Sequence, residues 1–251
     1  MTIQACAELV QRGDPDRFLA VMAAPPAARE RLFPLYAFNL EVARAPWVTK
    51  ETLIAEMRLQ WWRDVVEAAA SGAARAHEVA GPLHALIAQA GLPLDVLDGL
   101  IAARRWDIHR DAHESRAALH QYLEDTGAGL MWLAARALGA PDGAEPAVRD
   151  YGWASAAAAY LRAVPDLVAR GRVPLPKGMA AVDLAQEGLA RLARARAARA
   201  TVPRAARPAL LAGWQAGFTL RALVDRPDDP ASLSEFQRRG RLLWQSVSGR
   251  W

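Results

Sequence analysis

The sequence contains few of the features that would place it outside a reducing compartment. Cys6 is the single cysteine among 251 residues, so no disulfide can form within the chain. No run approaches eighteen uninterrupted apolar residues, and this predicts no membrane-spanning helix. The first residues lack the basic-then-apolar order of a secretory signal. We therefore expect a cytoplasmic protein, with peripheral contact to an inner membrane as a further hypothesis.

Lysine is almost absent, although the chain is basic. Only Lys50 and Lys177 among its 31 basic side chains are lysines, and the formal net charge is +4. The abundance of alanine and arginine indicates a GC-rich coding bias, which accounts for part of this charge. The remainder suits an anionic ligand, a membrane surface or an acidic partner. There is no basic tail and no aromatic–basic strand pattern, so we expect no nucleic-acid binding.

Strand patterns are scarce, whereas apolar residues recur with the helical period of 3.6 throughout. Asp14 followed by Pro15 predicts a helix start, because a carboxylate caps the free amides and proline is tolerated in the first turn. Gly127 and Gly129 inside a helical pattern indicate close packing or a kink. Hydrophobic residues make up 53% of the chain, enough for a sizeable core. The sequence predicts one all-α domain over residues 1–251, with 1–13 frayed.

The expected helix bounds follow from these periods and from Pro and Gly breaks. They are about 15–24, 27–45, 49–71 (opened by Thr49 with Thr52), 81–91, 93–110, 115–138, 147–164, 184–200, 205–224 and 232–247.

Histidines and an aspartate cluster in one segment. His109 and His113 are four residues apart, with Asp107 and His120 nearby, and this spacing can bind a metal. The segment is dense with charge and has no cysteine. A solvated helix end is therefore the favoured interpretation.

Five segments stand in a recognisable order: LFPLYAFNLEVAR, IAEMRLQWWRDVV, LIAARRWDIHR, LHQYLEDTGAGLMWLAARALG and LRAVPDLVARGRVPLP. This order resembles the squalene/phytoene synthase family, whose enzymes condense prenyl diphosphates head to head. The resemblance covers nearly the whole chain. It implies a single all-α helical bundle of the isoprenoid synthase type around a central cavity. Asp107 matches an acid that recurs in this part of the family and has a structural role in this interpretation.

The family's enzymes hold Mg²⁺ between two aspartate-rich helices, because hard carboxylate oxygens and phosphate share the ion. Counted without gaps, the motif places hold non-acidic residues: Ala43, Arg44, Trp47, Ala163 and Leu167. Glu41 and Asp166 lie nearby, but one acid at each site does not make two chelating faces. Pro46 and Pro165 should also distort the two helices. The resemblance therefore implies no cofactor, and Mg²⁺ only if the ligands are displaced, with Glu41, Asp166 and Asp107 as substitutes.

The sequence resembles one subgroup of the family even more than it resembles the family as a whole. The segments YAFNLEVA and MRLQWWRD resemble phytoene-synthase-like proteins related to a mitochondrial assembly factor for respiratory complex I. The matching residues are Tyr36, Ala37, Phe38, Asn39, Glu41, Ala43, Met57, Arg58, Gln60 and Trp62. That subgroup also lacks the aspartate motifs. It implies a non-catalytic role, with respiratory complex subunits or assembly proteins as partners.

The basic turn RGRVPLP offers a candidate anion site. Guanidinium groups match phosphate oxygens bidentately, so Arg162, Arg170 and Arg172 are candidates to bind a diphosphate. A solvated basic turn with structural ion pairs is the equal alternative. Tyr36 either points into the cavity or is a core aromatic.

Two helical features could contact a lipid. Arg58 with Trp61 and Trp62 could face a lipid-like ligand, but adjacent helical residues cannot share a face, so at least one tryptophan should be core. The basic helix at 184–200 could lie on an anionic membrane. An exposed arginine-rich surface helix is the favoured alternative.

Three hypotheses follow. The first is a degenerate family member that acts in assembly, or binds an isoprenoid or other lipid in its cavity. The second is an active head-to-head condensing enzyme, a Mg²⁺-dependent prenyltransferase with displaced ligands. The third is an interaction module with a filled cavity. Fold analogy alone does not decide among them.

Overall fold

The computed structural model describes residues 3–72, 74–109, 111–227 and 233–251, and within these ranges the chain is helical and has no strands. This agrees with the predicted all-α class. The α-helices are α1 (Ile3–Gly13), α2 (Pro15–Met22), α3 (Pro26–Arg44), α4 (Thr52–Ser71), α5 (Ala80–Ala90), α6 (Leu94–Ala103), α7 (Arg105–Ile108), α8 (Arg116–Leu123), α9 (Gly129–Ala137), α10 (Glu145–Ala169), α11 (Ala181–Ala197), α12 (Ala216–Asp225) and α13 (Glu235–Ser248). Shorter turns are the π-helix η1 (Glu124–Ala128) and the 3₁₀ segments η2 (Asp142–Ala144), η3 (Arg199–Thr201) and η4 (Arg207–Gly213).

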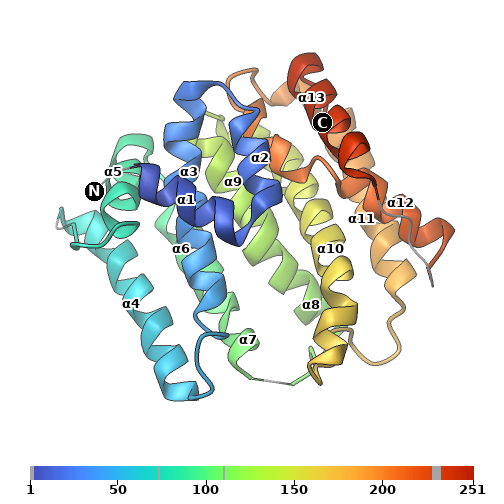
Figure 1. The fold of residues 1–251 in the computed structure, drawn as a ribbon, viewed down its shortest axis with the longest axis horizontal. Coiled ribbons are helices and arrows are strands. Elements are labelled where there is room, and N and C mark those ends of the chain that lie inside the picture. Colours follow the sequence, from blue (N-terminus) through green and yellow to red (C-terminus); the bar gives the residue numbers. More distant parts are fainter. Residues whose placement is uncertain (1–2, 73, 110, 228–232) are drawn as a thin grey trace.

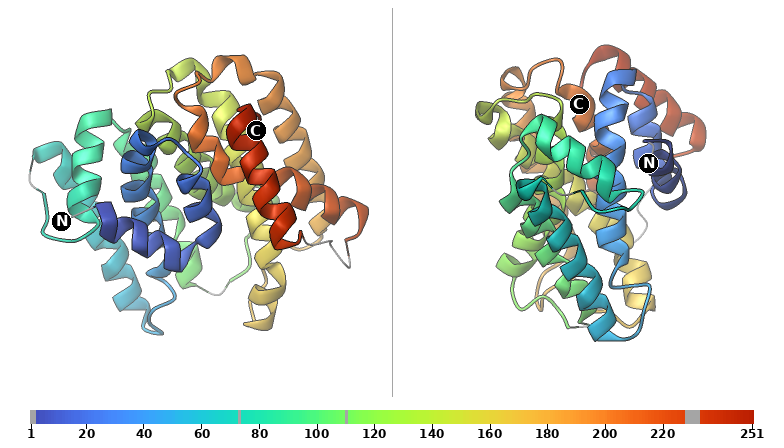
Figure 2. Two further views of the ribbon diagram at one scale, coloured as in Figure 1. Left: turned by 45° about the horizontal axis from the view of Figure 1, so that its top comes forward. Right: turned by 90° about the vertical axis from the view of Figure 1, so that its left-hand side faces the viewer.

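Helix α10 is the axis of the bundle. It spans 25 residues and packs against α11, α12, α9 and η1. Helices α1 to α6 lie to one side of it and α11 to α13 to the other (Figure 1; Figure 2 gives two further views). One hydrophobic cluster contains residues from Cys6 to Trp251, so both ends of the described chain contribute to the same core.

Helix boundaries follow local signals in the sequence. The Asp14 carboxylate accepts a hydrogen bond from the Arg17 amide at 3.0 Å and caps α2, as predicted. Helix α3 ends at Arg44, two residues before Pro46. Gly72 ends α4 with φ of 86°, a left-handed conformation that a side chain would strain.

Several predicted bounds are wrong. Residues 3–13 are not frayed but form α1, which packs on α3 and buries Cys6 and Val10; Met1 and Thr2 lie outside the described residues. Helix α10 continues through Pro165 to Ala169, although proline lacks the amide that would bond within the helix. The helix expected over 93–110 is divided at Arg104 into α6 and α7. That expected over 205–224 begins with the 3₁₀ segment η4.

The predicted kink at the glycines is a π-turn. Within 115–138, the α-helical path widens over Glu124–Ala128 and then resumes as α9. A Cβ added to Gly127 would lie 2.1 Å from the Ala156 Cβ on α10, and one added to Gly152 would lie 2.8 Å from the Ala128 Cα. The two segments therefore meet backbone to backbone.

Candidate functional site

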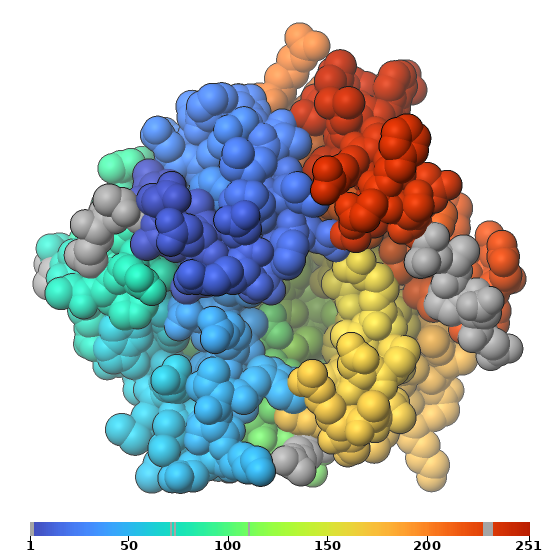
Figure 3. Space-filling view, in the orientation of Figure 1, coloured from blue at the N-terminus to red at the C-terminus, as the bar shows by residue number. Residues whose placement is uncertain are grey.

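A cavity of about 370 Å³ lies between α3 and α10. The hollow between the light-blue and yellow segments in Figure 3 shows where it opens. Its inner wall comes from η1 and α9, including Gly127, Leu130 and Met131, and its upper rim from α2 and η4. The cavity is not filled by tryptophan or leucine side chains, in contrast to the third hypothesis.

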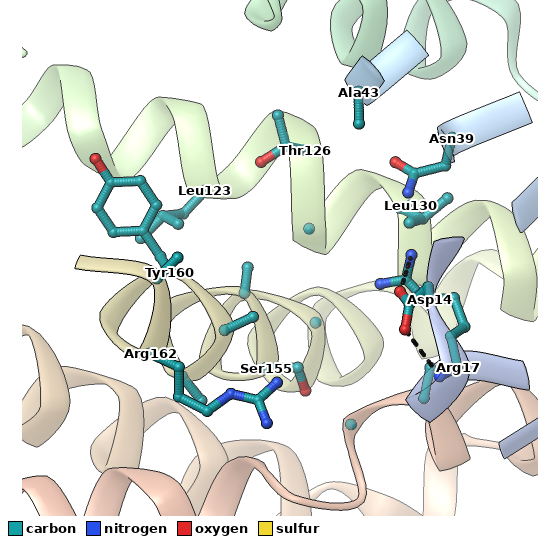
Figure 4. Close-up of a pocket in the computed structure, with 18 of the residues that line it drawn as sticks. Asp14, Arg17, Asn39, Ala43, Leu123, Thr126, Leu130, Ser155, Tyr160 and Arg162 are labelled. Carbon is teal, nitrogen blue, oxygen red and sulfur yellow. Dashed lines mark hydrogen bonds and ion pairs between the residues drawn. The ribbon is translucent and has the colours of Figure 1, made fainter. Parts of the chain in front are cut away.

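The two places where the family resemblance puts aspartate-rich motifs do face this cavity. Ala43 and Trp47 line it from the α3 side, and Ala163 and Leu167 line it from α10. Figure 4 shows Ala43 on the wall opposite α10. Arg44 is not among the lining residues, and its side chain is 58% exposed. The structure therefore supports the alignment with the family, because both motif sites face the same cavity. The four lining positions carry apolar side chains.

The cavity has carboxylates elsewhere, and each is paired with an arginine. Asp14 pairs with Arg17 at 3.3 Å, as the dashed lines in Figure 4 show. Asp107 pairs with Arg104 at 3.3 Å.

The third of these carboxylates is Asp16, which pairs with Arg162 at 3.7 Å and with Arg238. Within the described ranges, no three His, Cys, Asp or Glu side chains gather as a metal cluster would require. These donors do not fit a Mg²⁺ cluster, because each carboxylate is already paired with an arginine.

Asp107 belongs to a buried polar cluster. The Arg104 guanidinium donates to the Tyr122 hydroxyl at 2.7 Å, and that hydroxyl donates to Asp107 at 3.0 Å. Asp107 is 5% exposed, and burial raises the pKa of Tyr122 well above its ordinary value. This is the structural role that the family resemblance predicted for Asp107.

The interpretation of this segment as a solvated helix end is wrong for His113. Its ring stacks on Trp106 with centroids 3.8 Å apart and is 5% exposed. Burial lowers its pKa from the ordinary 6.5 to about 4. His109 is exposed, whereas His120 contacts Glu187, so the histidines do not converge on one ligand position.

Two polar side chains in the lining could meet a ligand. Asn39 is 5% exposed, and its Oδ1 is buried without a hydrogen-bond partner. Figure 4 shows its amide pointing into the cavity. Tyr36 lies one turn earlier on α3, also lines the cavity and has the Arg17 guanidinium 5.0 Å from its ring centroid. Burial raises the pKa of Tyr36 to about 12.

The arginines predicted to bind a diphosphate have separate polar partners, although Arg170 and Arg172 both lie over the Trp47 ring. Arg162 lines the cavity and donates to Gln215 at 3.3 Å. Arg172 is 8% exposed and donates to the main-chain carbonyl of Asp107 at 2.6 Å and to that of His109. Arg170 is exposed beside the Trp47 ring. Arg172 therefore holds the basic turn against α7, which is the structural alternative for this residue.

The remaining predicted ligand-binding residues lie outside the cavity. Glu41 pairs with Arg44 at 3.8 Å, and Asp166 and Arg58 are exposed. None of the three is in the cavity lining. Trp62 is buried, edge-on to Phe38 at 5.4 Å, as expected for one of the two adjacent tryptophans.

The basic helix predicted at 184–200 corresponds to α11 and its end. Arg191 pairs with Glu124, Asp150 and Glu187, and Arg194 makes two hydrogen bonds to Asp150 at 2.9 and 3.0 Å. These arginines neutralise acids of η1, α10 and α11 itself, which weakens the case for a membrane-binding helix here.

Comparison with known proteins decides the family. The squalene/phytoene synthase family profile matches residues 10–220. The chain belongs to the squalene/phytoene synthase family. Its fold agrees with solved members: a dehydrosqualene synthase in complex with ligand superposes with a TM-score of 0.84 at 15% identity, covering 98% of this chain and 95% of the other. The squalene synthase HpnC from Alicyclobacillus acidocaldarius gives a TM-score of 0.78 at 18% identity, covering 91% and 95%. The isoprenoid synthase bundle is thereby confirmed.

Curated relatives fall in the subgroup that the sequence resembles. The proteins named "NADH dehydrogenase (ubiquinone) complex I, assembly factor 6" are 29% identical over 192 residues in Bos taurus and 28% over 188 in Homo sapiens. These matches cover 76% and 74% of this chain, and 58% and 56% of the relatives. The chain therefore spans little more than half the length of the relatives it matches. Among the described residues, no helix is both long and apolar enough to cross a membrane.

Sequence reasoning missed two parts of the site. Asn39 shares a helical face with Tyr36 and Ala43, and a polar residue on that inward face was an available signal. Asp16 gave no such signal, because Gln215, which donates to it at 2.7 Å, is 199 residues away.

Proposed function

We propose that this protein is a non-catalytic member of the squalene/phytoene synthase family that acts in the assembly of respiratory complex I and holds an isoprenoid or similar lipid in its cavity. The observation that carries the proposal is the pair of walls formed by Ala43 and Trp47 on one side and Ala163 and Leu167 on the other. Diphosphate departs readily only when metal ions neutralise its charge. Apolar walls at these positions supply no oxygen ligands.

The pairing of the cavity carboxylates supports the same conclusion. Asp14, Asp16 and Asp107 would each have to exchange an arginine for Mg²⁺. The alternative, an active condensing enzyme with displaced ligands, needs Glu41, Asp166 and Asp107 to act together. Glu41 is paired with Arg44 and Asp166 is exposed, so this set offers no common site within the described residues.

The lining suits a ligand with an apolar body and a polar end. Small and apolar side chains such as Ala43, Leu130 and Leu167 make up part of it, beside polar and paired charged side chains, and the size falls within the range of small-molecule sites. The unpartnered Oδ1 of Asn39 would accept a hydrogen bond from a ligand hydroxyl. A prenyl alcohol has this chemistry, and it needs no metal.

The first test is an assay of diphosphate release from farnesyl and geranylgeranyl diphosphates with and without Mg²⁺. We expect no release above background in either case. Release that depends on Mg²⁺ and is lost in Arg162→Ala would support the condensing enzyme instead.

The second test concerns the partner and the lipid together. The protein is captured from membranes, and the captured material is analysed for respiratory complex subunits and for extractable isoprenoids. Ala43→Phe should fill the cavity and remove the lipid, whereas Ala193→Phe on the exposed side of α11 should not. Capture of neither class by the wild-type protein would contradict the proposal.

A further inference from the structure

The last helix, α13, carries large apolar side chains on the outside of the molecule. Phe236, Leu243, Trp244 and Val247, here called the outer stripe, are 87%, 65%, 63% and 78% exposed. At the helical rotation per residue they fall within an arc of about 100°. Single exposed apolar residues are ordinary, but four along one face of one helix indicate a surface made to be covered.

The opposite face of α13 fixes the helix to the bundle. Leu242 packs into a cluster with Trp214 and Leu211, Gln245 donates to the Trp214 carbonyl at 3.2 Å, and Ser246 donates to the Ala23 carbonyl at 2.8 Å. The outer stripe is therefore held outward by contacts on the other side. In Figure 3, α13 (red) lies on the face that also contains the hollow of the cavity.

Positive charge without carboxylate partners borders the outer stripe. Arg241 packs over the Phe218 ring, and burial together with nearby Arg221 and Arg196 lowers its pKa. In the part of the chain that the structure describes, neither Arg241 nor Arg221 forms an ion pair. This repulsive grouping would be relieved by an anionic surface.

A second cavity, the arginine pocket, lies at the C-terminal end of the stripe. It has a volume of about 260 Å³ and includes Arg204, Arg207 and Arg250, with Val247 of the outer stripe in its lining. The Nε of Arg207 donates to the Val202 carbonyl at 3.3 Å, which leaves its other nitrogens for a ligand. Within the described ranges, none of these three arginines pairs with a carboxylate. Guanidinium groups around one hollow match phosphate oxygens.

We propose that α13 docks on an anionic phospholipid bilayer, with the outer stripe in the boundary between headgroups and acyl chains and a lipid phosphate in the arginine pocket. Apolar side chains on one face and unpaired arginines beside them are the features of helices that lie in the membrane interface. The membrane-facing helix is therefore α13 rather than α11, whose arginines are engaged within the protein. The proposal does not depend on what the main cavity binds.

The test is co-sedimentation with vesicles of phosphatidylcholine alone and of phosphatidylcholine mixed with phosphatidylglycerol. The wild-type protein should bind the mixed vesicles and release at high salt. Changing Phe236, Leu243 and Val247 to serine should abolish binding without unfolding, because these residues have few contacts to lose. Leu53→Ser with Met57→Ser is the matched control on α4, where the two side chains are 72% and 64% exposed.

The charge requirement is tested separately. Arg204→Gln with Arg250→Gln should lower the partition coefficient about 25-fold, at about fivefold for each arginine near the surface. Arg58→Gln on exposed α4 should leave it unchanged. The side of the protein that enters the membrane is identified with a fluorophore on Val247→Cys, which is labelled selectively because Cys6 is fully buried. The emission of this fluorophore should shift to the blue when vesicles are added. A fluorophore on Met57→Cys should show no shift.

Four results would overturn the proposal. They are absence of binding by the wild-type protein, equal binding to neutral vesicles, loss of binding in the α4 control rather than in the α13 variant, and release from vesicles by inorganic phosphate alone. The last would make the arginine pocket a site for free phosphate. If the wild-type protein does not bind vesicles but captures a protein that the α13 variant does not capture, this face is a protein interface.

Discussion

Asp16 on α2 accepts a hydrogen bond from Arg238 on α13, although the two residues are 222 positions apart in the chain. The same carboxylate accepts from Gln215 at 2.7 Å and lies 3.7 Å from Arg162 of the cavity. Asp16 therefore joins the first helices, the last helix and the cavity rim through one side chain.

Asp16→Ala should lower the free energy of unfolding by about 2–3 kcal/mol, because it leaves partly buried donors without their charged acceptor. Glu235→Ala is the control, since Glu235 also pairs with Arg238 but is 63% exposed and should cost about 0.5 kcal/mol. Urea denaturation of both variants measures the difference. Equal losses of unfolding free energy in the two variants would mean that Asp16 stabilises the protein no more than an exposed ion-pair partner does.

Gly127→Ala should be strongly destabilising. The added methyl carbon would lie 2.1 Å from the Ala156 Cβ, so η1 and α10 would have to separate at a cost of about 1–3 kcal/mol or more. Gly143→Ala, with no atom within 4 Å of the new carbon, should be near neutral. The free energies of unfolding of the two variants provide the comparison, and a neutral Gly127→Ala would show that this contact is looser than described.

Acid should weaken the protein through His113. Its pKa is about 4 when folded and near the ordinary 6.5 when unfolded, so the unfolded state binds more protons between these values. The free energy of unfolding should fall as the pH is lowered from about 6.5 to 4, by at most about 3 kcal/mol, and this contribution then levels off. His113→Phe keeps a ring against Trp106 and should flatten the profile. Denaturation midpoints at several pH values test this, and an unchanged slope would contradict it.

Cys6 should react slowly with thiol reagents. Burial raises its pKa to about 11, and its side chain is fully buried, so the native thiolate is both scarce and shielded. The reaction with an aromatic disulfide reagent at pH 8 should be at least about 100-fold slower than in urea. Fast native labelling would mean that α1 opens readily from the bundle.

The helices and the family were predictable because both rest on local patterns. The capping aspartate Asp14 and the kink near Gly127 follow from local sequence, and the family resemblance implied the placement of Ala43 and Ala163 at the two facing motif sites. The role of Arg172 did not follow, because its partners are main-chain carbonyls whose position depends on the fold. Nor did the stability of residues 3–13, since burial of Cys6 against α3 depends on packing between segments.

The direction of α13 shows the same limit. Its sequence reveals an amphipathic helix, but Leu242 and Leu243 are the same residue type, so composition does not tell which of them packs inward. Only the assembled bundle decides that Leu242 packs inward on Trp214 and that Leu243 faces out. Apolar side chains lie on both of these sides of α13. The side that the bundle covers is structural, and the side that it leaves open is available for binding.

The backbone contact between Gly127 and Gly152 also determines how this cavity can change. Both glycines line it, and so does Gly213, whose added Cβ would lie 2.5 Å from the Tyr151 ring. Where the floor is main chain, it offers no rotamers to adapt and no side chains to exchange. The depth of the cavity at these glycines is therefore a property of the helix crossing, and a change of ligand size must come from side chains elsewhere in the lining, such as Leu130 and Met131 or Trp47, which stands beside Arg172.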